Sequence, residues 1–283
     1  MPASECPQMI RPQNDCEPGA KIAFTKASAC GNDFLLVEGA NVSGDLAALT
    51  RRLCDRHRGV GADGVEWLFP DTEADVNARL LNADGSEAEI SGNGTRCVAA
   101  EICSRTTKTE VVIRTGAGLK TCRLIAKQDP SFEFETDMGA PELGSDLAIE
   151  TDALQVVGMA VSMGNPHFVI FVQDFHEGWQ SEAALIGKQP QFPQGTNVEY
   201  VAVRAVKERG ASEIEIRIFE RGAGETQSSG TGSCAAAVAA IASARATSPV
   251  KVVAPGGSQT VRWEKQVYLQ GPATLVCRGE FFI

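Results

Sequence analysis

Hydrophobic and polar residues alternate at 110–115 and 120–125, and this period of two predicts half-buried β-strands. A further strand is predicted at 212–219. A strongly apolar strand is predicted at 167–172. Further strands are predicted at 21–25, 35–38, 65–69, 76–81, 132–137, 154–161, 197–203, 250–253, 258–264, 266–270 and in the closing segment 273–283.

Helical periodicity is confined to a few short segments. Leu46, Leu49 and Leu53 recur at near-helical spacing within 45–56. Other helices are predicted at 95–104, 182–186 and 233–244. Many strands with one central helix in each half of the chain predict an α+β fold, in which the strands are mostly antiparallel.

The two central helices follow a short sequence that occurs twice. Ser91-Gly92-Asn93-Gly94 opens one helix and Ser229-Gly230-Thr231-Gly232 opens the other, 138 positions later. A glutamate stands four residues before each serine, Glu87 in the first copy and Glu225 in the second. This repeat indicates two pseudo-symmetric halves with one site in the cleft between them.

Each repeated turn suits the binding of an anion. The first N–H groups of a helix have no partner within the helix and lie at the positive end of its dipole. Glycines allow a ligand to approach the backbone closely. A single Ser-Gly-x-Gly turn usually only caps a helix, so the repetition carries the interpretation. Two such turns facing each other are expected to hold one carboxylate through the backbone near Gly92, Asn93, Gly230 and Thr231.

The chain length of 283 residues agrees with two domains. Residues 1–20, rich in proline and polar side chains, are expected to form a disordered N-terminal extension. We assign 21–129 with 271–283 to an N-terminal half, and 130–270 to a C-terminal half. Residues 137–151 are expected to be weakly structured and to mark the transition between the halves.

Composition excludes several classes of function. A net charge of −10 argues against nucleic acid or an anionic membrane as a partner. Nine cysteines without CxxC spacing are expected to be free thiols in a reducing cytoplasm. The N-terminus lacks a signal-peptide pattern, and only three histidines occur, so neither export nor a histidine-rich metal site is expected.

Several ordered motifs resemble the diaminopimelate epimerase family. The resemblance covers about residues 22–283, and the matching segments are 31–34, 54–57, 59–64, 82–89, 92–94, 164–167, 197–199, 220–222 and 268–273. It implies two similar halves, each a sheet wrapped around a central helix. It also implies cofactor-independent interconversion of LL- and meso-diaminopimelate, in lysine and peptidoglycan synthesis, by a cytoplasmic homodimer.

The resemblance assigns the recognition of this dicarboxylic diamino acid to specific side chains. They are Asn32, Asn82, Asn165, Asn197, Glu220 and Arg221, with His167 in a supporting role. An arginine can bind the distal carboxylate with two hydrogen bonds, and a glutamate can accept the distal ammonium.

The chain departs from the family pattern at the two proton-transferring positions. The family has cysteine at the start of both glycine-rich turns, whereas this chain has Ser91 and Ser229. A thiol with a pKa of about 8.5 can be tuned toward a thiolate, but a serine hydroxyl requires a neighbouring base. Glu87 and Glu225 are candidates for that base, and the alternative is that they only cap the turns.

Three functional hypotheses remain from the sequence. The first is epimerisation of diaminopimelate with Ser91 and Ser229 as the residues on either side of the α-carbon. The second is a related isomerase acting on another substrate, for example by double-bond isomerisation as in phenazine biosynthesis. The third is a diaminopimelate-binding homologue that has lost catalysis because both bases are serine.

Overall fold

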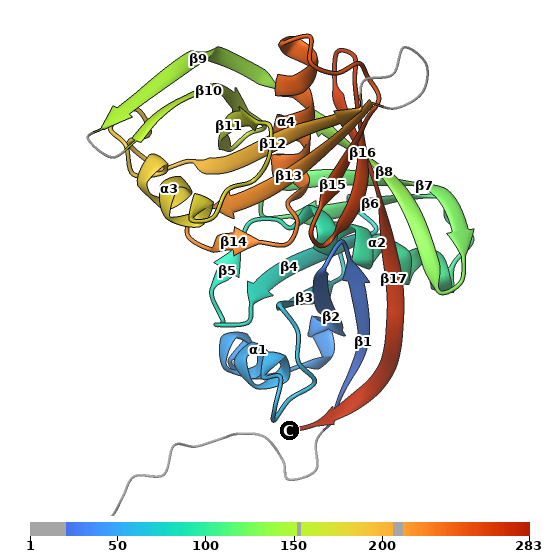
Figure 1. Cartoon of the computed structure of the whole chain (residues 1–283). Helices are drawn as coiled ribbons and strands as arrows, with labels where there is room; N and C mark the ends of the chain where they lie inside the picture. Colours follow the sequence, from blue (N-terminus) through green and yellow to red (C-terminus); the bar gives the residue numbers. More distant parts are fainter. Residues whose placement is uncertain (1–20, 152–153, 206–211) are drawn as a thin grey trace, which may run out of the picture.

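The computed structural model describes residues 21–151, 154–205 and 212–283, so the expected extension at 1–20 lies outside the described residues (Figure 1). Strands β1 to β8 are Lys21–Ala29, Asn32–Glu38, Gly64–Phe69, Val76–Asn82, Glu87–Ala88, Glu110–Thr115, Gly118–Gln128 and Ser131–Gly139. Strands β9 to β17 are Glu142–Thr151, Leu154–Ser162, Pro166–Val172, Asn197–Ala205, Ser212–Glu220, Gly224–Thr226, Val250–Ala254, Gly257–Trp263 and Val267–Phe282. The helices are α1 (Leu46–Cys54), α2 (Gly92–Arg105), α3 (Trp179–Ile186) and α4 (Gly230–Ala242), with a 3-10 turn η1 (Gly39–Asn41).

Strand pairing closes the N-terminal half into a ring around α2. The ring runs from β1 through β2, β3, β4, β6, β7 and β8 to β17, which pairs again with β1. Inside it, the residues from Cys97 to Ala100 of α2 are completely buried and pack against Phe34, Ile113 and Phe134. An apolar helix surrounded by strands on all sides accounts for the core of this half.

The C-terminal half repeats this plan around α4. Its strands follow the order β9, β10, β11, β12, β13, β15, β16 and β17. The residues from Cys234 to Ala240 of α4 are all completely buried. Alanine side chains allow the strands to approach the helix closely on every face. Strand β17 belongs to both halves, because it pairs with β1, β8 and β16.

The two halves match strand by strand. In each half two parallel pairs flank an antiparallel one: β2 with β3 and β4 with β6 correspond to β11 with β12 and β13 with β15. The short strands β5 and β14 each lead into the central helix. The predicted α+β fold with one central helix per half is therefore confirmed, and Figure 1 shows the halves stacked, with α4 in the upper half and α2 in the lower half.

The structure corrects the sequence prediction in three places. Residues 142–151 form strand β9, which pairs with β10, although we expected a weakly structured segment. Helices α2 and α4 begin at Gly92 and Gly230, three residues earlier than predicted, because the serine caps allow helix to start on glycine. The final strands merge into the single long strand β17.

Candidate active site

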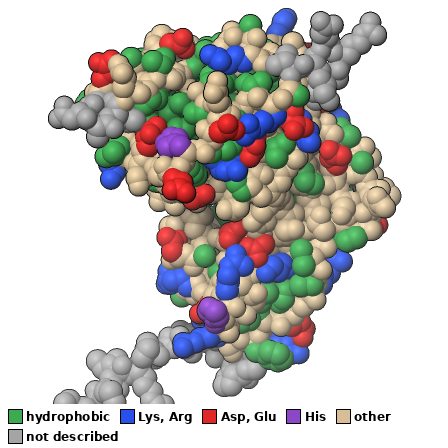
Figure 2. Space-filling view, in the orientation of Figure 1, with side chains coloured by type: hydrophobic (Ala, Val, Ile, Leu, Met, Phe, Trp, Pro, Cys, Tyr) green, Lys and Arg blue, Asp and Glu red, His purple; other side chains and the backbone are tan. Residues whose placement is uncertain are grey.

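The N-terminal ends of α2 and α4 meet between the two halves (Figure 1). A Cβ placed on Gly230 would lie 3.7 Å from the Cα of Gly92, and a Cβ placed on Gly92 would lie 3.8 Å from the Cα of Gly230. The two glycine-rich turns are thus neighbours in space, as the internal repeat predicts. Figure 2 shows a recess in the molecular surface between the halves.

Each helix start is capped by the serine that opens its turn. Ser91 Oγ accepts a hydrogen bond from the Gly94 N–H at 3.1 Å, and Ser229 Oγ accepts one from the Gly232 N–H at 3.3 Å. Within the described residues, the first-turn N–H groups left without a hydrogen bond are those of Gly92, Asn93, Gly230 and Thr231. These groups lie at the positive ends of two helix dipoles, so they suit one carboxylate.

Two asparagines bind the helix starts from equivalent strands. Asn32, at the start of β2, accepts a hydrogen bond from Asn93 Nδ2 at 2.7 Å. Asn165, just before β11, donates to Thr231 Oγ1 at 3.3 Å. Asn93 and Thr231 occupy the same place in the two copies of the repeated turn, so both halves position their turn in the same way.

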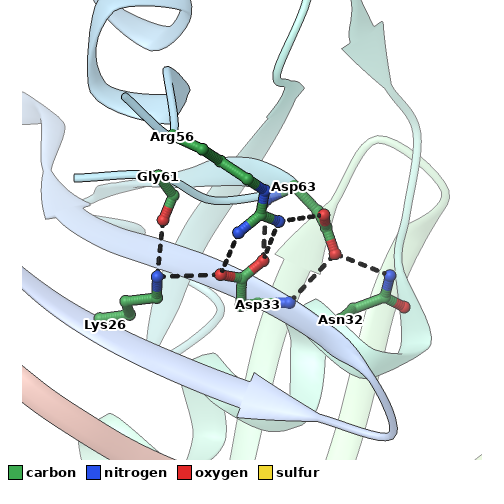
Figure 3. A network of polar contacts seen from close by, with 6 residues as sticks. All are labelled: Lys26, Asn32, Asp33, Arg56, Gly61 and Asp63. Carbon is green, nitrogen blue, oxygen red and sulfur yellow. Dashed lines mark hydrogen bonds and ion pairs between the residues drawn. The ribbon is translucent and has the colours of Figure 1, made fainter. Parts of the chain in front are cut away.

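A network of charged side chains holds Asn32 in place, as Figure 3 shows. Asn32 Nδ2 donates to Asp63 Oδ2 at 3.0 Å. Asp63 and Asp33 both pair with Arg56 at 2.8 Å, and Asp33 also pairs with Lys26 at 2.9 Å. Burial opposes ionisation of Asp33, but the hydrogen bonds from Arg56 and Lys26 outweigh it and lower its pKa. The network therefore directs the Asn32 amide oxygen toward α2.

Arg96 places a buried positive charge inside α2. Its side chain is completely buried and forms no ion pair with any carboxylate of the described residues. The guanidinium donates to Asn93 Oδ1 and, at 3.2 Å, to the Pro272 carbonyl, while Nη1 has no partner. This uncompensated charge strengthens the preference of the adjoining helix start for an anion.

A second polar group lies where β12 begins and β13 ends. Asn197 Oδ1 accepts a hydrogen bond from the Arg221 backbone N–H at 2.9 Å. Glu220 accepts one from Thr226 Oγ1 at 2.7 Å, and burial raises the pKa of this glutamate. The Arg221 guanidinium is exposed, so it is accessible to a ligand.

Asn82 is the last residue of β4, just as Glu220 is the last residue of the equivalent strand β13. Its side chain donates to Ser86 Oγ at 3.1 Å and remains exposed. Among the described contacts, none joins Asn82 to Arg221 or Glu220. Of the predicted substrate ligands, the C-terminal half therefore carries Asn165, Asn197, Glu220 and Arg221. The N-terminal half carries Asn32 and Asn82.

His167 forms a buried pair with a glutamate that we did not predict as a site residue. His167 Nδ1 lies 2.7 Å from Glu199 Oε1, and both side chains are completely buried. The other ring nitrogen lies 3.0 Å from Asn165 Oδ1. The chain of contacts from Thr231 through Asn165 and His167 thus ends at Glu199.

Comparison with known proteins identifies the family. The model of the diaminopimelate epimerase family matches residues 24–144 and 159–276. The chain belongs to the diaminopimelate epimerase family. A diaminopimelate epimerase of Pelotomaculum thermopropionicum is 40% identical over 280 residues, with 91% of this chain and 98% of the relative covered. One of Desulforudis audaxviator is 39% identical over 281 residues, with 92% and 99% covered.

More distant solved structures share the fold. A Bacillus anthracis phenazine biosynthesis protein of the PhzF family superimposes with a TM-score of 0.68 at 14% identity, over 93% of this chain and 100% of the other. A probable proline racemase from Agrobacterium radiobacter K84 also gives a TM-score of 0.68, at 16% identity and with 91% and 92% covered. At this level of identity the similarity concerns the fold alone.

Glu87 and Glu225, the predicted bases for the serines, make other contacts in this member of the diaminopimelate epimerase family. Glu87 on β5 is exposed and pairs with Arg79 at 2.7 Å, and these hydrogen bonds lower its pKa. Glu225 on β14 is also exposed and accepts a hydrogen bond from Gln180 at 3.0 Å. Among the described contacts, neither carboxylate bonds to a serine.

The buried glutamates nearest the serines are Glu66 on β3 and Glu199 on β12, and sequence reasoning missed both. Each is a single acidic residue in an apolar strand, within Val65-Glu66-Trp67 and Val198-Glu199-Tyr200. This second internal repeat was the signal that could have found them. Charged residues are almost never fully buried in an apolar strand unless they are paired or functional.

The cysteines next to the turns lie in the core. Cys97 and Cys234 are completely buried inside α2 and α4. Burial raises the pKa of Cys234 to about 12 and that of Cys97 still further, so neither thiol ionises near neutral pH. Both cysteines are therefore small residues of the core.

Metal-binding clusters and membrane-spanning helices are both absent from the described part of the chain. It contains no group of three or more His, Cys, Asp or Glu side chains placed to hold a metal ion. Its helices are all too short or too polar to cross a membrane.

Proposed function

We propose that this member of the diaminopimelate epimerase family interconverts LL- and meso-diaminopimelate by moving the proton on the α-carbon, without a cofactor. The observation that carries the proposal is the meeting of two serine-capped helix starts at Gly92 and Gly230. A carboxylate bound by the free N–H groups of both turns would place the attached α-carbon between Ser91 and Ser229. One serine then faces each side of the carbon.

The helix starts also stabilise the transition state. When the α-proton leaves, negative charge spreads from the carbon onto the bound carboxylate. The four free N–H groups are fixed at the helix starts and the buried charge of Arg96 lies in the first turns of α2, so little reorganisation is needed. Stabilisation of this kind replaces the electron sink that a cofactor would provide.

The distal end of the substrate is assigned to the polar group on the C-terminal half. Arg221 presents its guanidinium at the surface and is the ligand proposed for the distal carboxylate. Glu220, Asn82, Asn165 and Asn197 are proposed as ligands of the distal ammonium and of the remaining carboxylate oxygens. A compound without the second amino-acid group would lack these contacts.

We also propose, on the family resemblance, that the protein works as a homodimer in the cytoplasm. Light scattering of the purified protein tests the dimer. A mass near the 30.0 kDa of one chain would contradict it.

Proton NMR in deuterium oxide tests the reaction. LL-diaminopimelate incubated with the protein is expected to lose its α-proton signal while the meso isomer appears, and the meso isomer is expected to give the reverse. Ser91→Ala and Ser229→Ala are expected to abolish inversion. Binding of diaminopimelate by calorimetry without any exchange would instead support a binding protein and refute the epimerase.

A further inference from the structure

Glu66 and Glu199 occupy equivalent positions behind the two serines. In the N-terminal half, Gly64 at the start of β3 pairs with Phe34 on β2, and Glu66 follows two residues later. In the C-terminal half, Asn197 at the start of β12 pairs with His167 on β11, and Glu199 follows two residues later. Both glutamates therefore point to the same side of equivalent strands.

The second glycine of each turn lies against both the serine and the glutamate of its half. A Cβ on Gly232 would lie 2.9 Å from Glu199 Oε1 and 3.3 Å from Ser229 Oγ. A Cβ on Gly94 would overlap Glu66 Oε1 and would lie 3.3 Å from Ser91 Cβ. In each half the carboxylate and the serine therefore approach the same glycine, although no hydrogen bond joins the two side chains among the described contacts.

The two carboxylates differ in their neighbours. Glu66 is 3% exposed and has no hydrogen bond or ion pair within the described residues. Glu199 pairs with His167, whereas the equivalent position in the N-terminal half is Phe34. Glu220 at the end of β13 is affected by Glu199: burial raises the pKa of Glu220, and the charge of Glu199 raises it further.

We propose that Glu66 and Glu199 are the proton partners of Ser91 and Ser229, so that each serine passes a proton between the substrate carbon and its own glutamate. This inference rests on the proposed epimerase function. A serine hydroxyl cannot remove an α-proton unaided, because its own proton must go to a base. The two glutamates are positioned to be that base and its counterpart acid, and they act through the serines.

The transfers balance on the two sides of the carbon. On one side the C–H bond breaks, the proton moves to the serine oxygen, and the hydroxyl proton moves to the glutamate carboxylate. On the other side the protonated glutamate gives its proton to the second serine, whose own hydroxyl proton forms the new C–H bond. Each turnover thus moves the shared proton from one glutamate to the other, and the reverse reaction or exchange with water resets it.

The difference in environment assigns the resting roles. Desolvation raises the pKa of Glu66 to about 8, so this carboxyl carries a proton at neutral pH. Burial also raises the pKa of Glu199, but the adjacent His167 acts against it. Groups whose surroundings separate their proton affinities are suited to the roles of acid and base. Glu66 therefore holds a proton that it can give to Ser91, whereas Glu199 is the carboxyl that has a histidine partner.

The variants Glu66→Gln and Glu199→Gln test the proposal in deuterium oxide, each with both isomers as separate substrates. Each variant is expected to invert substrate at least about 100-fold more slowly than the wild type, the usual size of general acid–base effects. Each is expected to exchange the α-proton of one isomer only, with retention, and the two variants should act on opposite isomers. A purely structural role would slow both isomers equally.

Two further variants separate chemistry from folding. Ser91→Cys in the Glu66→Gln background is expected to restore inversion by about 10-fold or more, because a thiol can hold and release the proton itself. Glu66→Asp keeps an acid at the same place and is expected to retain part of the activity and the pH dependence near 8. The matched control is Glu101→Gln. Glu101 is also a buried glutamate, but it lies on α2 and pairs with Arg278, so this variant should invert substrate at the wild-type rate.

These experiments distinguish a failure of the glutamate proposal from a failure of the proposed epimerase function. A wild-type protein that leaves both isomers unexchanged refutes the epimerase itself. A wild type that inverts, with Glu66→Gln and Glu199→Gln within about threefold of it, refutes only the role of the glutamates. The role of the glutamates is also refuted if each variant loses activity equally on both isomers. It is likewise refuted if Ser91→Cys gives no rescue and Glu66→Asp has no activity.

Discussion

Glu66 Oε1 lies in the space that a Cβ on Gly94 would occupy. Gly94→Ala is therefore expected to displace the glutamate, to destabilise the fold by about 1 to 3 kcal/mol through overpacking, and to slow inversion by at least about 10-fold. Urea unfolding and NMR exchange rates measure the two effects.

The second-site change Glu66→Asp provides the control for this prediction. Shortening the side chain by one methylene makes room for the new methyl group, so the double variant is expected to recover most of the lost stability. Additive losses in the double variant would show that Gly94 and Glu66 do not compete for the same space.

The stability of the protein is expected to depend on the ionisation of Glu66. Its pKa is raised from 4.5 in the unfolded chain to about 8 in the folded protein. Between these values the native state holds a proton that the unfolded state has released, so this group makes the free energy of unfolding fall as pH rises. The fall is about 1.4 kcal/mol per pH unit at most.

Glu66→Gln removes this term, so the variant should gain stability relative to the wild type as pH rises from 5 to 8. Urea denaturation at several pH values measures the difference. A constant difference across this range would mean that Glu66 is ionised in the folded protein at neutral pH.

Arg221 is expected to act on binding rather than on proton transfer. Arg221 is exposed, directly follows β13, and its guanidinium donates to the Gln194 carbonyl at 3.1 Å. Arg221→Met should raise KM for diaminopimelate by about 10-fold or more and change kcat much less, because a contact with the distal carboxylate is the same in the ground state and the transition state. Steady-state kinetics measure both constants.

Arg217→Met is the matched control for this prediction. Arg217 lies on the same strand and pairs with Glu215 at 3.1 Å, so its loss should leave KM unchanged. A fall in kcat with unchanged KM for Arg221→Met would contradict the assignment to the distal carboxylate.

The epimerase activity is expected to resist alkylation of the protein's thiols. Serine replaces the reactive cysteine that the family resemblance implies at both turns, and Cys97 and Cys234 are buried with raised pKa values. Cys277 is the exposed cysteine of the described residues. Iodoacetamide should therefore modify Cys277 without loss of epimerase activity, as mass spectrometry and the NMR assay can show together.

Ser91→Cys should reverse this behaviour. The new thiol lies at a helix start, where the dipole lowers its pKa, so iodoacetamide should inactivate the variant. Diaminopimelate bound at the site should slow the inactivation. Loss of wild-type activity on alkylation would place an unrecognised thiol in the mechanism.

The repeat of Ser-Gly-x-Gly was sufficient to predict two serine-capped helix starts, at Gly92 and Gly230. Glycine and serine in this pattern have little choice of local structure, since serine caps a helix and glycine permits close approach. The two helix starts meet at Gly92 and Gly230 for that reason. The candidate bases Glu87 and Glu225 were chosen because each stands four residues before its serine. Separation along the chain does not determine the direction in which a carboxylate on a short strand points.

By itself the sequence determined the α+β class, the two matching halves and the family. These depend on local periodicity and on short motifs of consecutive residues, which can be identified without the tertiary structure. Only the tertiary structure decided which acids lie beside the serines. Strands β3 and β12 bring Glu66 and Glu199 against Gly94 and Gly232 through pairing between residues far apart in the chain. The environment of each carboxylate, apolar for one and shared with His167 for the other, exists only once the sheets have closed around their helices.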